Sequence, residues 1–106
     1  LGEKIRYDKL VRDRIPEILD EKGKRYEIRN CNHDEISSYL HKKLLEEVSE
    51  FIEKPSIEEL ADIQEVILTL TQNMGYSRHE LEFIREIKVI ENGGFEHKLI
   101  LEEVTD

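Results

Sequence analysis

The fold of this chain depends on two stretches, LLEEVSEF at residues 44–51 and ELAD at residues 59–62. Each stretch holds an acidic pair at i, i+3 spacing: Glu47 with Glu50, and Glu59 with Asp62. On an α-helix, side chains three residues apart lie on one face, with Cβ atoms roughly 5–6 Å apart. Two such helices packed side by side would therefore bring four carboxylates together.

Four carboxylates at one place need a compensating charge, because like charges repel and burial disfavours the ionised form. A hard divalent cation supplies that charge. Mg²⁺ suits the position, since it is held by a few carboxylates and completed by waters and substrate phosphates. The spacing therefore predicts a metal-dependent site that acts on a phosphate-bearing small molecule.

Apolar residues at helical spacing surround both stretches. They predict one long helix over residues 33–54 and a second over residues 57–73, with Pro55 between them. In the first helix Glu47 falls within the inward apolar stripe, where an acid needs a partner or a cation. The second helix is apolar around most of its circumference, which predicts a central buried helix. Asp62 is the acid on it that is hardest to explain without a metal.

Glu59 has a second explanation in the sequence. Ser56 and Glu59 have the spacing of a capping box, in which the two side chains satisfy free backbone N–H groups at the start of a helix. From local pattern alone, Glu59 is therefore either a capping acid or a metal ligand.

Shorter elements are predicted on either side of the long helices. A short helix over residues 16–22 ends at a glycine, and a third long helix over residues 77–91 begins at a capping box. Period-2 alternation predicts strands over residues 24–31 and 95–101, which would pair as a small appendage packed on the helices. The expected fold is thus mainly all-α, a helical bundle with a small two-stranded β appendage, in one domain spanning residues 1–106.

Composition excludes several classes of function. The net charge is −9, and an acidic protein is a poor binder of polymeric nucleic acid, which needs Lys and Arg to neutralise phosphates. Residues 1–30 carry a net charge of +2, so a contact to a small phosphate is expected there. No apolar run is long enough to span a membrane, and the single cysteine, Cys31, has no partner for an internal disulfide. We expect a cytoplasmic protein.

Three motifs together resemble a known family. They are the acidic stretches, an opening YDKLVRDRIP at residues 7–16, and a closing Lys88 followed by NGGF at residues 92–95. This combination resembles the all-α NTP pyrophosphohydrolase superfamily, which includes MazG and phosphoribosyl-ATP pyrophosphohydrolase. The opening is similar to that of its small house-cleaning branch. That branch commonly has Arg where this chain has Asn92.

The resemblance implies a function and a set of site residues. It implies an all-α fold that completes its core as a homodimer or homotetramer, and hydrolysis of a non-standard nucleoside triphosphate to the monophosphate and pyrophosphate. It implies Mg²⁺ or Mn²⁺ held by Glu47, Glu50, Glu59 and Asp62, with Glu46 as a further ligand or a neighbour of the ligands. It also implies phosphate contacts from Lys9, Arg12 and Lys88. Glu47 or Glu50 would accept the proton of the attacking water.

Two alternative functions stay open at this stage. One is the phosphoribosyl-ATP pyrophosphohydrolase of histidine biosynthesis, although the opening motif fits the house-cleaning branch better. The other is a non-catalytic helical module that binds nucleotide or protein through a solvated acidic face.

Overall fold

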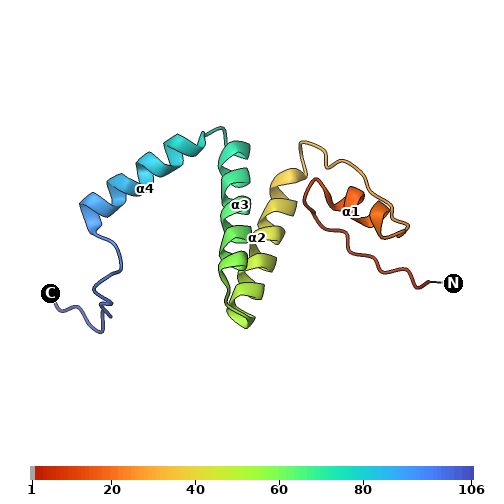
Figure 1. The fold of residues 1–106 in the computed structure, drawn as a ribbon. Helices are drawn as coiled ribbons and strands as arrows, with labels where there is room; N and C mark the ends of the chain where they lie inside the picture. The colour runs from red at the N-terminus through yellow and green to blue at the C-terminus, as the bar shows by residue number, and fades with distance from the viewer. Residues whose placement is uncertain (1) are drawn as a thin grey trace.

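The computed structural model describes residues 2–106, which form four α-helices and, within those residues, no β-strand. The helices are α1 (Ile15–Glu21), α2 (Ile36–Glu53), α3 (Ile57–Asn73) and α4 (Arg78–Asn92). The predicted all-α class is confirmed. In Figure 1, α2 and α3 pack side by side as an antiparallel hairpin, α1 lies on its N-terminal side, and α4 leads away from α3 on the other side.

The α2–α3 hairpin contains the core of the chain. Leu40 on α2 and Val66 on α3 are the two buried apolar side chains among residues 2–106. The hairpin bends at Pro55 and Ser56, and the Ser56 hydroxyl accepts a hydrogen bond from the Glu59 N–H at 3.1 Å. This cap starts α3 at the predicted residue.

The start of α2 lies three residues later than predicted. The Asn32 side chain accepts a hydrogen bond from the Glu35 N–H at 3.0 Å, and the Glu35 carboxylate accepts one from the Asn32 N–H at 3.1 Å. These reciprocal bonds form a turn over residues 32–35, so the regular helix begins only at Ile36.

A hydrogen-bonded turn sets the direction of α4. Gly75 has a positive φ of 92°, its N–H donates to the Gln72 carbonyl, and the Tyr76 N–H donates to the Thr71 carbonyl, both at 3.0 Å. This is a Schellman motif, in which glycine avoids the strain of a left-handed residue. Ser77 then opens α4 with a complete capping box, as the sequence predicts. The turn between the two helices is therefore fully bonded.

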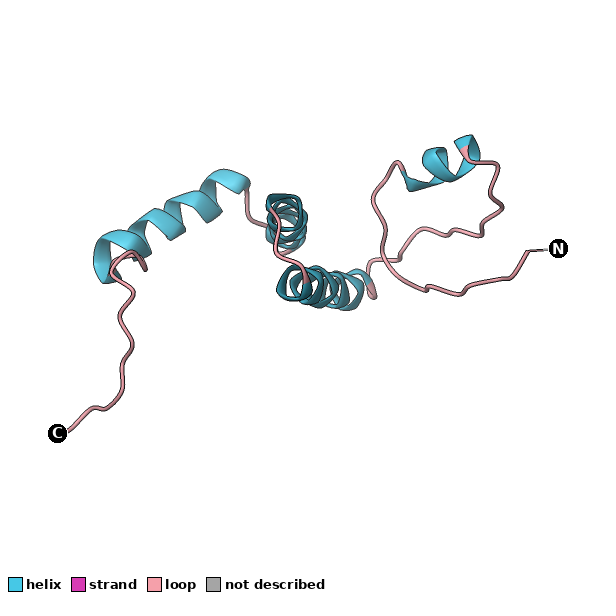
Figure 2. Ribbon diagram, turned by 60° about the horizontal axis from the view of Figure 1, so that its bottom comes forward, coloured by secondary structure: helices cyan, strands magenta, loops and turns pink. Residues whose placement is uncertain are grey.

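The predicted two-stranded β appendage is wrong. The segment 24–31 runs between α1 and α2, whereas the segment 95–101 follows α4, and the two lie at opposite ends of the molecule (Figures 1 and 2). A strand needs a neighbour to complete its hydrogen bonds, and alternation in a sequence does not supply one. The second segment also contains a turn, since the Lys98 N–H donates to the Phe95 carbonyl.

The predicted burial of α3 on all sides is also wrong within a single chain. Its face against α2 is covered, but Leu60 is 46% exposed and Met74 is 70% exposed. The molecule is elongated (Figure 2) and measures 66 × 31 × 25 Å, and many large apolar side chains of its helices are exposed. Within residues 2–106, no helix has both the length and the apolar character that crossing a membrane requires.

Candidate metal centre

Three of the four predicted carboxylates converge near the bend of the hairpin. Glu47 and Glu50 lie in the last turns of α2, and Glu59 lies in the first turn of α3. One oxygen from each of the three lies within 4.8 Å of the others. Two ligands on opposite sides of a Mg²⁺ ion are about 4 Å apart, so a small adjustment of these side chains suits a shared cation.

Two buried oxygens without a hydrogen-bond partner make this cluster a candidate cation site. Glu47 is only 6% exposed. One oxygen of Glu47 and one of Glu59, Oε2 in both, are buried without a hydrogen-bond partner among the described residues. An unsatisfied buried acceptor costs about 1–3 kcal/mol and a charged one costs more. A hard cation with oxygen ligands would remove that cost, so the donor set fits Mg²⁺ or Mn²⁺.

The pKa values of two of these acids are raised. Removal from water, together with the neighbouring carboxylates of Glu47 and Glu50, raises the pKa of Glu59 to about 7. The negative charge of Glu47 raises the pKa of Glu50, and partial burial adds to the effect. Both shifts are those expected of carboxylates that are crowded together and partly removed from water. Glu59 is thus used in the cluster, while Ser56 alone caps the helix through its side chain.

The fourth predicted ligand, Asp62, has a different partner. Its Oδ1 accepts a hydrogen bond from the Arg12 guanidinium at 2.6 Å, and it is not among the three converging acids. Asp62 lies one turn further along α3 than Glu59, on the half-buried side of the helix. The ion pair with Arg12 therefore accounts for the partial burial of Asp62, which the sequence alone did not explain.

A second cation from the same N-terminal segment, Lys9, pairs with an acid next to the cluster. Lys9 Nζ donates to Glu46 Oε1 at 2.8 Å. Burial on its own would raise the pKa of Glu46, but the bond from Lys9 and the charge of Lys43 outweigh it and lower that pKa. Lys9 and Arg12 are therefore each paired with an acid adjacent to the cluster, Glu46 on α2 and Asp62 on α3.

The segment that carries these cations is itself held to α2. The Tyr39 hydroxyl donates to the Asp8 carboxylate at 3.0 Å, and Arg29 donates to the Tyr39 oxygen at 3.2 Å. Asp8 has a positive φ of 46°, a conformation that short polar residues tolerate better than others. The Asp8–Tyr39 contact thus fixes the chain immediately before Lys9.

A hollow of about 690 Å³ opens beside the cluster at the bend of the hairpin. It is lined by Glu50, Glu53, Lys54, Ser56, Glu58 and Glu59. Four carboxylates and one ammonium group make this hollow strongly negative. A negatively charged phosphate group would be repelled by this hollow unless cations neutralised the carboxylates. A bound metal and the basic side chains of the N-terminal segment would supply that positive charge.

Two lysines are not where the sequence-based prediction put them: Lys88 was expected at the site, and Lys43 was not. Lys88 lies on α4, which leads away from the hairpin, so a single chain does not bring it to the carboxylates (Figure 1). Lys43 was missed, although its Nζ lies 3.5 Å from Glu46 and 3.3 Å from Glu47. Its i, i+3 and i, i+4 spacing from these two acids was a signal that could have found it.

Comparison of the chain with protein-family models, with curated protein sequences and with solved structures gives no match. A function for this chain must therefore be inferred from the carboxylates and from the cationic side chains that pair with their neighbours.

Proposed function

We propose that this protein is a metal-dependent nucleoside triphosphate pyrophosphohydrolase. The reaction would convert a non-standard NTP or dNTP to the monophosphate and pyrophosphate. One observation carries the proposal: Glu47, Glu50 and Glu59 converge, and one oxygen each of Glu47 and Glu59 is buried without a hydrogen-bond partner. The resemblance of the sequence motifs to the all-α NTP pyrophosphohydrolases supports the same reaction. Such a substrate belongs to the intracellular nucleotide pool, so we also propose a cytoplasmic location.

The residues that hold Mg²⁺ in this proposal are Glu47, Glu50, Glu59 and Asp62. The first three already lie together. Asp62 would join them as Arg12 turns from its carboxylate to a substrate phosphate, since the two ion pairs compete for one guanidinium. Glu46 stays next to the ligands and orients Lys9 and Lys43.

Bound metal would neutralise charge on the phosphate oxygens and lower the pKa of a bound water. The chain's own residues do the rest. Glu50 is exposed, so one of its oxygens could accept the water's proton while the other holds the metal. The water oxygen forms a bond to phosphorus, the bond to the bridging oxygen breaks, and pyrophosphate leaves. Lys9 and Arg12 stabilise the negative charge on the departing group.

The test measures pyrophosphate release from a panel of standard and modified nucleoside triphosphates, with Mg²⁺, Mn²⁺ or EDTA. We expect release that requires a divalent cation and falls at least 100-fold in Glu50→Gln and Asp62→Asn. Glu65→Gln is the matched control, because Glu65 lies on α3 and is exposed. All variants are checked for helix content. Equal activity in the site variants and in the control would refute the proposal.

Two further measurements distinguish the alternative functions. Faster turnover of phosphoribosyl-ATP than of any triphosphate would assign the chain to histidine biosynthesis. Calorimetry that detects binding of neither Mg²⁺ nor nucleotide, together with no turnover, would favour a non-catalytic module.

A further inference from the structure

Lys43 lies on α2, one turn before the neighbouring acids Glu46 and Glu47. Its side chain is only 16% exposed, and its ammonium nitrogen lies 3.5 Å from Glu46 Oε1 and 3.3 Å from Glu47 Oε1. A lysine is rarely buried to this extent unless it is paired. The two carboxylates therefore hold this ammonium group at the edge of the cluster.

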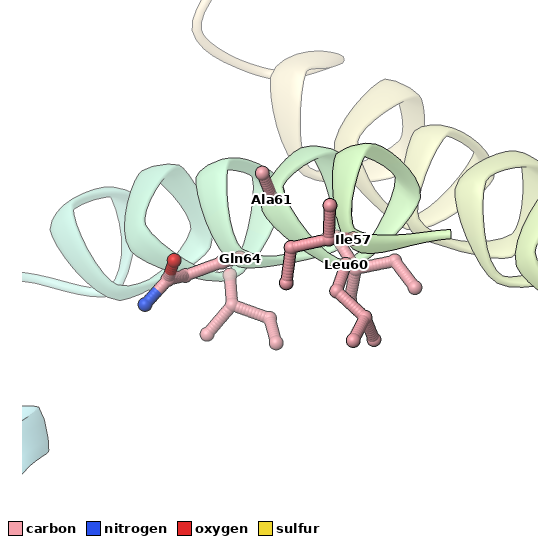
Figure 3. A pocket seen from close by; sticks show the side chains of 6 residues that line it. Ile57, Leu60, Ala61 and Gln64 are labelled. Carbon is pink, nitrogen blue, oxygen red and sulfur yellow. The ribbon is translucent and has the colours of Figure 1, made fainter. Parts of the chain in front are cut away.

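The cluster has no second cation of this kind. Among residues 2–106, no other basic side chain lies within ion-pair distance of the three converging carboxylates. The helix α3 contains no lysine, arginine or histidine, and the hollow on it is lined by five apolar side chains and one amide (Figure 3). Lys9 and Arg12 pair with acids next to the cluster. Within the described chain, the charge beside the converging acids therefore comes from Lys43.

The two oxygens of Glu47 have different surroundings. Oε1 lies beside Lys43, whereas Oε2 is buried and has no hydrogen-bond partner among the described residues. The last torsion of a glutamate side chain has broad preferences, so its rotamer alone does not fix where the two oxygens point. A contact to one oxygen sets the direction of the other. Lys43 is in a position to make that contact.

Glu46 is held in a different way from Glu47. Its Oε1 accepts a hydrogen bond from Lys9 at 2.8 Å and also lies near Lys43. Two lysines thus compensate the charge of Glu46, whereas Glu47 has one lysine and one free oxygen. Lys43 is shared between a carboxylate that is already neutralised and a carboxylate that still has an oxygen to give to a metal.

We propose that Lys43 is a positioning residue of the metal centre: it holds Glu47 Oε1 and thereby directs Glu47 Oε2 to the shared cation. The inference rests on the metal site of the proposed function, but not on the hydrolysis reaction. Loss of a side chain that orients a metal-binding carboxylate typically weakens metal binding about 10–100-fold.

Orientation and charge predict opposite effects of removing Lys43. An ammonium group repels a nearby divalent cation, so a lysine that acted only through its charge would make metal binding tighter when removed. A lysine that only filled space would be replaced without effect by methionine, which is unbranched and flexible. Weaker binding that a second cationic side chain restores is predicted by orientation alone.

The test is isothermal titration calorimetry of the full chain with Mn²⁺, in the absence of nucleotide. We expect Lys43→Met to weaken Mn²⁺ binding at least tenfold and Lys43→Arg to stay within about threefold of the unchanged chain. Lys42→Met is the matched control and should stay within about twofold. Lys42 is the neighbouring residue, is exposed, and lies over the Tyr39 ring, 5.4 Å from its centre.

Three results would overturn the positioning role. They are tighter or unchanged binding in Lys43→Met, an equal loss in Lys42→Met, and a loss in Lys43→Arg as large as in Lys43→Met. Circular dichroism checks that each variant folds. If Lys43→Met loses helix content, Lys43→Ala takes its place with the same expectation, because alanine is the best helix former.

The same titrations separate this inference from the proposed function. A chain that binds no Mn²⁺ before any substitution would refute the metal centre and the positioning role together. A chain that shows the expected affinities but releases no pyrophosphate would support the positioning role and refute the proposed reaction.

Discussion

The α2–α3 hairpin and α4 illustrate two different sources of order in one chain. The hairpin buries Leu40, Val66, Glu47 and Thr71, and its helices are stabilised by contact with each other. No side chain of α4 is buried, yet it begins with a complete capping box at Ser77 and ends at Gly93. The comparison teaches that capping residues are sufficient to define where a helix begins and ends. Whether the helix buries side chains depends on a second surface that packs against it.

The largest expected effect is on the hairpin. Leu40→Ala removes the most buried side chain of the chain, 1% exposed, and should lower the free energy of unfolding by about 2–5 kcal/mol. Urea unfolding measures it. Ile90→Ala on α4 should change the free energy of unfolding by less than about 0.5 kcal/mol, because Ile90 is 83% exposed. An equal loss in both variants would remove the distinction between the two regions.

The next effect is the stabilisation of the hairpin by metal. Mg²⁺ at 100 times its dissociation constant should add about 2.7 kcal/mol to the stability of the folded chain. Differential scanning fluorimetry with and without Mg²⁺ measures the rise in Tm. Glu47→Gln should abolish the rise, and Glu80→Gln on α4 should retain it as the control. A rise of the same size in Glu47→Gln would mean that the cation binds elsewhere.

Removing a cap should affect the two regions differently. Ser77→Ala should cost about 1 kcal/mol and reduce the helix content of α4, because little else in a single chain supports that helix. Ser56→Ala should cost a similar free energy without loss of helix content, because α3 packs on α2. Circular dichroism together with urea unfolding separates the two results. Equal loss of helix content would show that packing does not protect α3.

The smallest expected effect is a pH dependence in the metal-free chain. The pKa of Glu59 is about 7 in the folded chain and near 4.5 when unfolded, so the folded state binds more protons between these values. Stability should therefore fall as the pH rises from 5.5 to 8. Acids with lowered pKa values, such as Glu17 and Glu35, gain their stabilisation below this range. Tm measured against pH should become flatter in Glu59→Gln, and an unchanged slope would assign the effect to another group.

The sequence was sufficient where the signal is local. Ser56 and Ser77 start their helices and Gly23 ends α1 as predicted, because each acts through backbone groups within five residues. The burial of Glu47 also followed from its place in the apolar stripe of α2.

Prediction failed where the partner lies far along the chain or outside it. The partner of Asp62 is Arg12, 50 residues away, and helical spacing contains no information on such a pair. Alternation around Tyr26 suggested a strand, but a strand also needs a neighbour to bond with, and none lies beside it. The apolar side of α3 at Leu60 was taken as buried, because periodicity does not reveal whether the covering surface belongs to the same chain.

The short turn between α3 and α4 has a consequence for the direction that α4 takes. It contains only four residues, and backbone hydrogen bonds from Gly75 and Tyr76 to the end of α3 fix its path. Inserting a flexible Gly-Ser segment of about eight residues after Gly75 should release α4 from that path, by the reach of such linkers. The hairpin would keep its structure, and α4 would then move independently of it.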